Sequence, residues 1–472
     1  MHREMAAYYR QLAPTLSDRP AVKVAEHALR GRAFHLLAPA LPAAVHWYAS
    51  RQQHDQARHL LAGALKLLEH EPSGSERDHH SGTLRLLLAD VLGAAGAFGE
   101  QEEQLKASLK AGLACGDDRI VGSAYLRLGD AAVRGGRVLS AGRFLTQAEI
   151  RLRLAGDQRL LVQALTLKAS ANIVLGDHDE ARRVLRMALS TAARARDRLG
   201  YARVLLEVGR GLTDVDELLR ARRVLAHAVR LAEVEQAQLE IGRACVYAAR
   251  AHRELADFAT AEQLADRAIA IATALRDQGL EARATFLKGD VRLRRKEYSL
   301  ARASLDRAQD LAEQAGDRAI LVYVLADLAV VLQARRYPQH DIERAITFAK
   351  EAVRRASALE LPREQLLAQN ALALAYLAAG RPRWAITISA KALRMARGLP
   401  MTSKRFAEIL FVHYRILKAL RHPDAMPRLQ ETTRLVRTRI ERQRSEAARS
   451  LMANRDPFNR EVLKEGQRRL SL

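Results

Sequence analysis

Residues 117–156 read DDRIVGSAYLRLGDAAVRGGRVLSAGRFLTQAEIRLRLAG. From Ile120 to Ala132 the apolar residues recur at the spacing of one buried helical face. A second apolar stripe runs from Val138 to Leu152, and a glycine pair separates the two stripes. The stretch therefore predicts two antiparallel helices that are joined by a short turn.

Small residues in this unit recur along most of the chain with a period of 40 residues. A fixed period of roughly 20 to 50 residues predicts a stacked repeat architecture. Helices that pack only about 8–10 Å apart need a small side chain where they cross. The recurring positions are Ala141, Ala181, Ala221, Ala261 and Ala301; then Ala148, Ala188, Ala228, Ala268 and Ala308; and Gly129, Ala169, Gly209, Ala249 and Gly289.

The repeats begin and end with the same local signals. Gly156 is a typical residue for the end of a helix, and Asp157 is a typical N-cap for the next one. Aspartates at the same phase precede other units, at Asp117, Asp197, Asp277 and Asp317. We therefore expect each repeat to start at a capped helix.

This pattern of small residues resembles the tetratricopeptide repeat. The period of 40 residues exceeds the usual repeat of about 34, and the terminal proline is missing, which indicates a long-helix variant. The resemblance extends to the repeat region of bacterial signalling regulators that are linked to kinases or ATPases. The residues that carry it are Tyr125, Leu128, Gly129, Ala141, Leu145 and Ala148, with the turn aromatics Phe258, Tyr298 and Trp384.

The resemblance implies an all-α fold, a right-handed superhelical α-solenoid of antiparallel helix pairs. Residues 35–440 would form about ten such pairs, because the alanine series continues upstream to Ala57 and downstream to Ala425. Residues 1–34 are out of phase and are expected to form an N-terminal helical cap. Residues 441–472 are expected to form a basic C-terminal helical tail.

Motifs for catalysis or metal binding are missing from the sequence. It contains no phosphate-binding loop, His-Glu-x-x-His, Gly-x-Ser-x-Gly or Cys-x-x-Cys pattern. The histidine clusters at His79-His80 and Asp177-His178-Asp179 offer too few converging ligands for a metal. We therefore expect no enzyme activity, no cofactor and no metal.

The cysteines and the hydropathy of the sequence indicate in which cellular compartment the protein is expected. Cys115 and Cys245 lie far apart in the sequence, and Cys245 falls at a core position of its repeat. No stretch approaches the roughly 18 apolar residues that a membrane helix needs, and no secretory signal is recognisable. These observations predict a cytoplasmic protein without a membrane span.

Positive charge is concentrated near the C-terminus. The formal net charge is +23, and residues 381–472 carry 22 Lys and Arg against 8 Asp and Glu. This end is either a solvated helix or a docking surface for an acidic protein, a nucleic acid or an anionic lipid. The candidate binding residues here are Arg434, Arg437, Arg439, Arg442 and Arg444.

A second group of arginines follows the repeat period. In tetratricopeptide-like arrays the first helix of each pair lines the concave groove. Guanidinium groups in such a groove would grip a carboxylate of a bound peptide, unless neighbouring glutamates of the chain already pair with them. The candidate groove residues are Arg203, Arg210, Arg243, Arg250 and Arg283.

The sequence thus favours a non-catalytic scaffold or regulatory subunit in bacterial signalling. It would bind an extended or helical segment of a partner protein, such as a Ser/Thr kinase or an ATPase-type regulator, in its concave groove. One alternative is a module that senses a peptide or metabolite. Another is a nucleic-acid-associated protein that uses its basic end, although aromatic residues for base stacking are scarce there.

Overall fold

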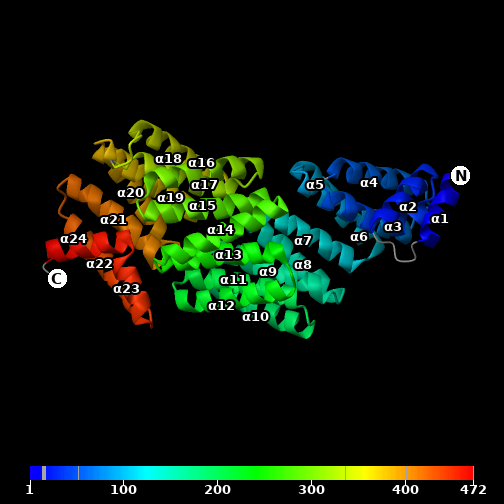
Figure 1. Ribbon diagram of the computed structural model, residues 1–472, viewed down its shortest axis with the longest axis horizontal. Helices are drawn as coiled ribbons and strands as arrows, with labels where there is room; N and C mark the ends of the chain where they lie inside the picture. Colours follow the sequence, from blue (N-terminus) through cyan, green and yellow to red (C-terminus); the bar gives the residue numbers. More distant parts are fainter. Residues whose placement is uncertain (13–17, 52, 335, 400–401, 471–472) are drawn as a thin grey trace. The chain divides into compact units, whose positions relative to one another are not determined.

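Helices make up all the regular structure that the computed structural model describes, which covers residues 1–12, 18–51, 53–334, 336–399 and 402–470 (Figure 1). The all-α class predicted from the sequence is therefore confirmed. The helices are α1 His2–Leu12, α2 Asp18–Arg30, α3 Phe34–Ser50, α4 His54–Leu68, α5 Ser75–Ala94, α6 Phe98–Cys115, α7 Asp118–Arg134, α8 Val138–Leu154, α9 Gln158–Leu175, α10 His178–Arg194, α11 Arg198–Asp214, α12 Leu218–Val234, α13 Gln238–Glu254, α14 Phe258–Leu275, α15 Gln278–Arg294, α16 Tyr298–Gln314, α17 Arg318–Leu332, α18 Ile342–Ala358, α19 Pro362–Ala378, α20 Pro382–Arg397, α21 Ser403–Ala419, α22 Ala425–Glu441, α23 Glu446–Asn454 and α24 Pro457–Leu470.

The chain divides into two compact units. Unit 1 comprises Met1–Val133 and Leu139–Lys168, and unit 2 comprises Arg134–Val138 and Ala169–Leu472. Within each unit, successive helices pack against one another as antiparallel neighbours, which is the arrangement of a helical solenoid. In unit 2 the odd-numbered helices from α11 to α17 also contact one another in order, so the first helices of successive pairs form one continuous layer.

The close approach within a helix pair explains the periodic small residues. A Cβ atom added to Gly209 in α11 would lie 2.4 Å from Cγ of Leu225 in α12. One added to Gly129 in α7 would lie 2.6 Å from Cγ of Leu145 in α8. Larger side chains at these positions would force the two helices apart.

The turns between repeats follow the predicted capping signals. The Asp197 and Asp277 side chains each accept a hydrogen bond from a backbone N–H in the first turn of the helix that follows. The residue before each of these aspartates is left-handed, with φ of 53° at Arg196 and 54° at Arg276, as is Gly156 with φ of 69°. The turn geometry is therefore constant, although glycine provides it only in some repeats.

Two short helices follow the last helix pair. α23 begins at the capping Ser445, and α24 packs on α22. At the other end of the chain, α1 and α2 precede the pair formed by α3 and α4. The described residues of the predicted cap over 1–34 and of the predicted tail over 441–472 thus lie mostly in helices, and the status of these segments as separate domains remains a prediction.

Candidate functional site

A cavity of about 200 Å³ lies inside unit 2 among the first helices of the repeats. Side chains from α9, α11, α13, α17, α19 and α21 line it, so segments that are distant in sequence share one surface. Arginines, carboxylates and aliphatic side chains alternate around its wall. They include Arg210, Arg250, Arg363 and Arg405; Asp214, Glu364 and Glu408; and Ile173, Leu366, Leu367 and Ile409.

Asp214, at the end of α11, lies among the positive charges of the cavity. Arg250 forms an ion pair with it, and Nη1 of Arg363 lies 3.9 Å from its Oδ2. Burial opposes the charged carboxylate, but Arg250, Arg210, Arg363 and Arg405 together lower the pKa of Asp214. One carboxylate therefore faces four guanidinium groups.

Two of these arginines are held in place by groups of the chain itself. Nη2 of Arg210 donates to Oγ of Ser170 at 2.7 Å and pairs with Glu207 at 2.8 Å. Nη1 of Arg363 donates to the backbone carbonyl of Ile173 at 2.9 Å, although the two residues are 190 positions apart. This last contact joins the start of α19 to the end of α9 within unit 2.

Arg405 lies in a different environment. Its guanidinium carbon lies 5.7 Å from the centroid of the Tyr323 ring, as in a cation–π contact. The hydroxyl of Tyr323 donates to Oε1 of Glu364 at 2.6 Å. Burial and the negative charge of Glu364 raise the pKa of Tyr323 to about 12. Burial opposes the charge on Arg405, yet Tyr323 and Glu364 raise the pKa of this arginine overall, so it stays cationic.

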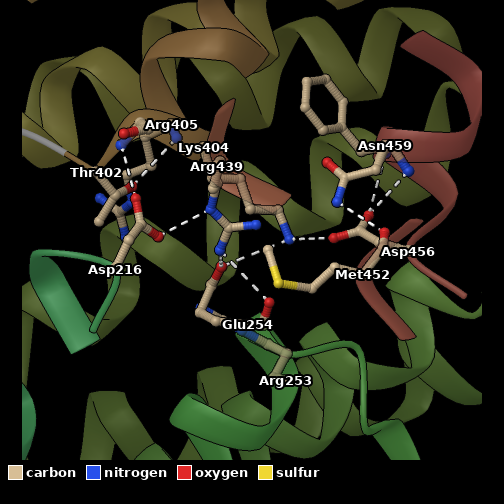
Figure 2. A network of polar contacts seen from close by, with 12 residues as sticks. Asp216, Arg253, Glu254, Thr402, Lys404, Arg405, Arg439, Met452, Asp456 and Asn459 are labelled. Atoms are coloured by element: carbon tan, nitrogen blue, oxygen red, sulfur yellow. Dashed lines mark hydrogen bonds and ion pairs between the residues drawn. The ribbon is translucent and has the colours of Figure 1, made fainter. Parts of the chain in front are cut away.

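Next to the cavity, unit 2 contains a buried cluster of ion pairs. Figure 2 shows Arg439 of α22 between Asp216 and Glu254, and Lys404 of α21 between Glu254 and Asp456. The separations are 2.8 Å from Arg439 to Asp216 and 2.7 Å from Lys404 to Asp456. We call these five residues the closure cluster, because they join α21, α22 and the start of α24 to the turn after α11 and to the end of α13.

Opposite charges set the ionisation of the closure cluster. Burial alone would raise the pKa of Glu254, but Lys404, Arg253, Arg294 and Arg439 hold it well below its ordinary value. The pKa of Asp456 is likewise lowered, against the effect of burial, chiefly by Lys404. The cluster therefore consists of charged groups at neutral pH.

One further position of the 40-residue repeat holds charged residues that belong to the cavity wall and to the closure cluster. Asp214, Glu254 and Arg294 occupy the same position in three successive first helices, five residues after the small residue. Asp214 lines the cavity, Glu254 belongs to the closure cluster, and Arg294 pairs with Asp290 at 3.0 Å. The candidate residues predicted from the sequence lie at other phases of the repeat, so this position was not predicted.

The five predicted groove arginines fall into two groups. Arg210 and Arg250 line the cavity, whereas Arg203, Arg243 and Arg283 are not among its lining residues. Arg203 pairs with Glu240 at 2.7 Å, and Arg283 pairs with Asp317 at 2.9 Å. Arg243 is exposed, and no described residue forms an ion pair with it. Four of the five thus pair with carboxylates of the chain, and their role in binding a partner remains a prediction.

The five predicted arginines of the basic end also differ from one another. Arg439 is buried in the closure cluster, with 2% of its side chain exposed, so it does not belong to a free surface. Arg434, Arg442 and Arg444 are exposed, and Arg437 is half-buried. Docking of a partner on these four remains a prediction.

The histidine clusters do not bring metal ligands together. Nδ1 of His79 contacts Asp117 at 2.9 Å. Burial, and then the charge of Arg363, lower the pKa of His178. Within the described part of the chain, no group of three or more potential ligands is placed to hold a metal ion. Over the same residues, no helix has the length and apolar character to cross a membrane.

Comparisons with known proteins bear on the fold. No protein-family model and no curated protein matches the chain. A crystal structure of a Rap protein complexed with competence and sporulation factor is 16% identical, covers 79% of this chain and 99% of that chain, and has a TM-score of 0.56. The chain therefore shares its fold, an array of tetratricopeptide-like helix pairs, with this Rap protein.

Two further structures are less similar. Aspartyl phosphate phosphatase F from Bacillus subtilis is 14% identical, covers 75% of this chain and 92% of that chain, and has a TM-score of 0.48. A signal transduction ATPase from Pyrococcus horikoshii with a tetratricopeptide repeat sensor is 13% identical, covers 71% of this chain and 52% of that chain, and has a TM-score of 0.43.

Proposed function

We propose that this protein is a non-catalytic regulatory protein that binds a peptide segment of its partner in the cavity of unit 2. The observation that carries the proposal is the cavity itself, which six helices enclose with both charged and aliphatic side chains. Binding sites commonly combine an apolar lining with a few placed polar groups. The Rap protein that this chain resembles in fold was crystallised with competence and sporulation factor, which is consistent with a binding role for the repeats.

The lining suits a peptide. Leu366, Leu367 and Ile409 offer apolar contacts for a side chain, while Asn370 and Thr402 offer hydrogen-bonding groups for an extended backbone. The polar groups come from α19 and from the N-cap of α21, so both kinds of contact are available along one wall. A peptide satisfies such a mixed wall better than a purely apolar ligand does.

The wider role proposed here is that of a scaffold or regulatory subunit in bacterial signalling in the cytoplasm. The partner that supplies the segment would be a Ser/Thr kinase or an ATPase-type regulator. The fold likeness to a bacterial regulator supports this role. Sensing of a free peptide or a metabolite in the same cavity is the alternative.

The test uses the full chain and a randomised hexapeptide library. Peptides retained by the wild type are identified by mass spectrometry, and their affinities are measured by calorimetry. Asn370→Trp would fill the cavity and should weaken binding by about tenfold or more. Leu300→Trp is the matched control, because Leu300 is 51% exposed on α16 and is not among the cavity-lining residues.

Retention of no peptide by the wild type would contradict the proposal. So would equal affinities for the wild type and Asn370→Trp. Saturation of the cavity by free amino acids or nucleotides in the same calorimetric experiment would instead favour metabolite sensing.

A second candidate function concerns the basic end. No described residue pairs with Arg434, Arg437, Arg442 or Arg444, which leaves their charge available to an acidic partner. If nucleic acid binds there, affinity for a random-sequence duplex should fall steeply as salt is raised, because counterions are released. Binding that is absent at low salt would exclude this function.

A further inference from the structure

Arg405 stands apart from the other arginines of the cavity. Arg210, Arg250 and Arg363 each lie within ion-pair distance of a carboxylate. Among the residues that the structure describes, no carboxylate lies within that distance of Arg405. Its guanidinium group instead faces the ring of Tyr323 on the cavity wall. A half-buried cation without a carboxylate is costly unless a ligand supplies one.

The arginines of the cavity differ in whether a carboxylate contacts them. Four guanidinium groups line the wall together with the carboxylates of Asp214, Glu364 and Glu408. Glu408 lies 3.6 Å from Arg294, a cation outside the lining, and is therefore shared with it. Glu207, outside the lining, pairs with Arg210 at 2.8 Å, so Arg405 is the lining guanidinium group that no described carboxylate contacts.

The backbone N–H groups around Arg405 already have partners. It lies in the first turn of α21, where Oγ1 of Thr402 accepts a hydrogen bond from its backbone N–H at 3.2 Å. The N-terminus of a helix carries a partial positive charge and favours anions. Asp216 already supplies such an anion, because its Oδ2 accepts a hydrogen bond from the backbone N–H of Ser403 at 3.1 Å. The guanidinium group of Arg405 is therefore what this point of the wall offers to a ligand.

We infer that Arg405 binds a carboxylate of the peptide that occupies the cavity; this inference rests on the proposed function. A guanidinium fork accepts a carboxylate through two parallel hydrogen bonds. The Tyr323 ring lies against the guanidinium group and the Tyr323 hydroxyl is fixed by Glu364, so the arginine is held in place before the ligand arrives. The carboxylate belongs either to the C-terminus of the peptide or to an Asp or Glu side chain.

A carboxylate fits this site better than a phosphate. The ligand group must lie near Asp214, Glu364 and Glu408, whose negative charges repel a second anion. A phosphate monoester carries nearly twice the charge of a carboxylate at neutral pH, so the repulsion is correspondingly larger. The charge at Arg405 matches a single negative charge.

The experiment presents three hexapeptide libraries to the full chain. The first has free C-termini and lacks Asp and Glu. The second is amidated at the C-terminus and contains Asp and Glu, and the third is amidated and lacks both residues. We expect the wild type to retain either the first or the second library at least about tenfold better than the third, which is the usual effect of a charged hydrogen bond.

Two variants assign the effect to this residue. Arg405→Met should bind the carboxylate-containing and carboxylate-free libraries equally, and Arg405→Lys should keep part of the preference, because it keeps the charge but loses the fork. Arg243→Met is the matched control, since Arg243 is exposed and is not among the cavity-lining residues. Circular dichroism and melting curves establish that each variant is folded.

The outcomes separate this inference from the proposed function. Preference for the first library identifies a C-terminal carboxylate, and preference for the second identifies a side-chain carboxylate; both support the inference. Equal retention of all three libraries overturns the carboxylate site and leaves peptide binding intact. Retention of none overturns peptide binding and the inference together. A preference that survives in Arg405→Met assigns the carboxylate to another residue.

Discussion

Two polar regions of unit 2 meet at the same helix, α21, and they differ in how their charges are paired. Lys404 contacts two carboxylates of the closure cluster and has 2% of its side chain exposed. Arg405, the next residue, lies on the cavity wall and contacts an aromatic ring instead. Each charged group of the closure cluster contacts an opposite charge, which indicates a role in holding the chain together. The lack of a described carboxylate at Arg405 indicates a place for a ligand.

The largest effect should come from breaking the closure cluster. Arg439→Met leaves the buried Asp216 and Glu254 without one of their cations, and such a loss destabilises proteins by about 3–5 kcal/mol. Urea unfolding in a Trp47→Phe background measures this, since Trp384 then reports on unit 2 alone. Arg437→Met, on the same helix and without a described carboxylate partner, should change stability by less than about 0.5 kcal/mol.

If Arg439→Met were no more destabilising than Arg437→Met, the pairing seen in the closure cluster would not be what holds this end of unit 2. The distinction between the two polar regions would then fail.

Lowering the pH should reduce the contribution of the closure cluster to the free energy of unfolding. The pKa values of Glu254 and Asp456 are lowered in the folded state, so both groups contribute stability above their unfolded values of about 4. That contribution is lost as the pH falls through the folded pKa values. Unfolding free energies from pH 7 to pH 2 should therefore decline below about pH 4, and the gap between wild type and Glu254→Gln should narrow there.

Glu441→Gln is the control for the pH series, because Glu441 is exposed at the end of α22. Its stability should run parallel to that of the wild type. A gap for Glu254→Gln that stays constant down to pH 2 would show that ionisation of Glu254 does not stabilise the fold.

Two of the predicted groove arginines also differ in pairing, and substituting them should give a smaller loss of stability than breaking the closure cluster. Arg203→Glu places a carboxylate beside Glu240, which is 5% exposed, and should cost about 2 kcal/mol. Arg243→Glu lies at the same phase without a partner and should cost less than about 0.5 kcal/mol. Melting curves of the two single variants make the comparison. Equal losses would mean that the Arg203–Glu240 pair contributes nothing.

The smallest effect is expected at Arg405. Arg405→Met removes a charge that no described carboxylate contacts, so stability should fall by less than the loss of about 2 kcal/mol expected for Arg203→Glu while peptide selectivity is lost. The same urea experiment measures the stability. A loss comparable to that of Arg439→Met would place Arg405 among the groups that hold the fold.

Much of the fold could be predicted from the sequence because repeats constrain their neighbours. Gly209 and Gly129 lie where an added Cβ atom would meet the partner helix, and the 40-residue period places only Gly or Ala at the equivalent positions. Asp197 and Asp277 cap helices as their phase predicted. All of these interactions join residues that are close in sequence or in adjacent helices.

The interior could be predicted only in part. Arg210 and Arg250 were predicted from their repeat phase, and both lie on the cavity wall. Their role in binding remains a prediction. Arg363 and Arg405 were missed, because they reach the cavity from outside the phases considered. The contacts of Arg363 with α9 and of Arg439 with Asp216 depend on the curvature that many repeats accumulate, which no local pattern specifies.

The pair formed by Arg439 and Asp216 has a consequence for how this protein can evolve. Repeat arrays commonly gain or lose units by duplication and deletion, because each unit contacts only its neighbours. Here the two partners are 223 residues apart in sequence, with α12 to α21 lying between them. Insertion or loss of one unit would move Arg439 away from Asp216 and leave both charges buried. The length of this array is therefore fixed by a contact between its distant members.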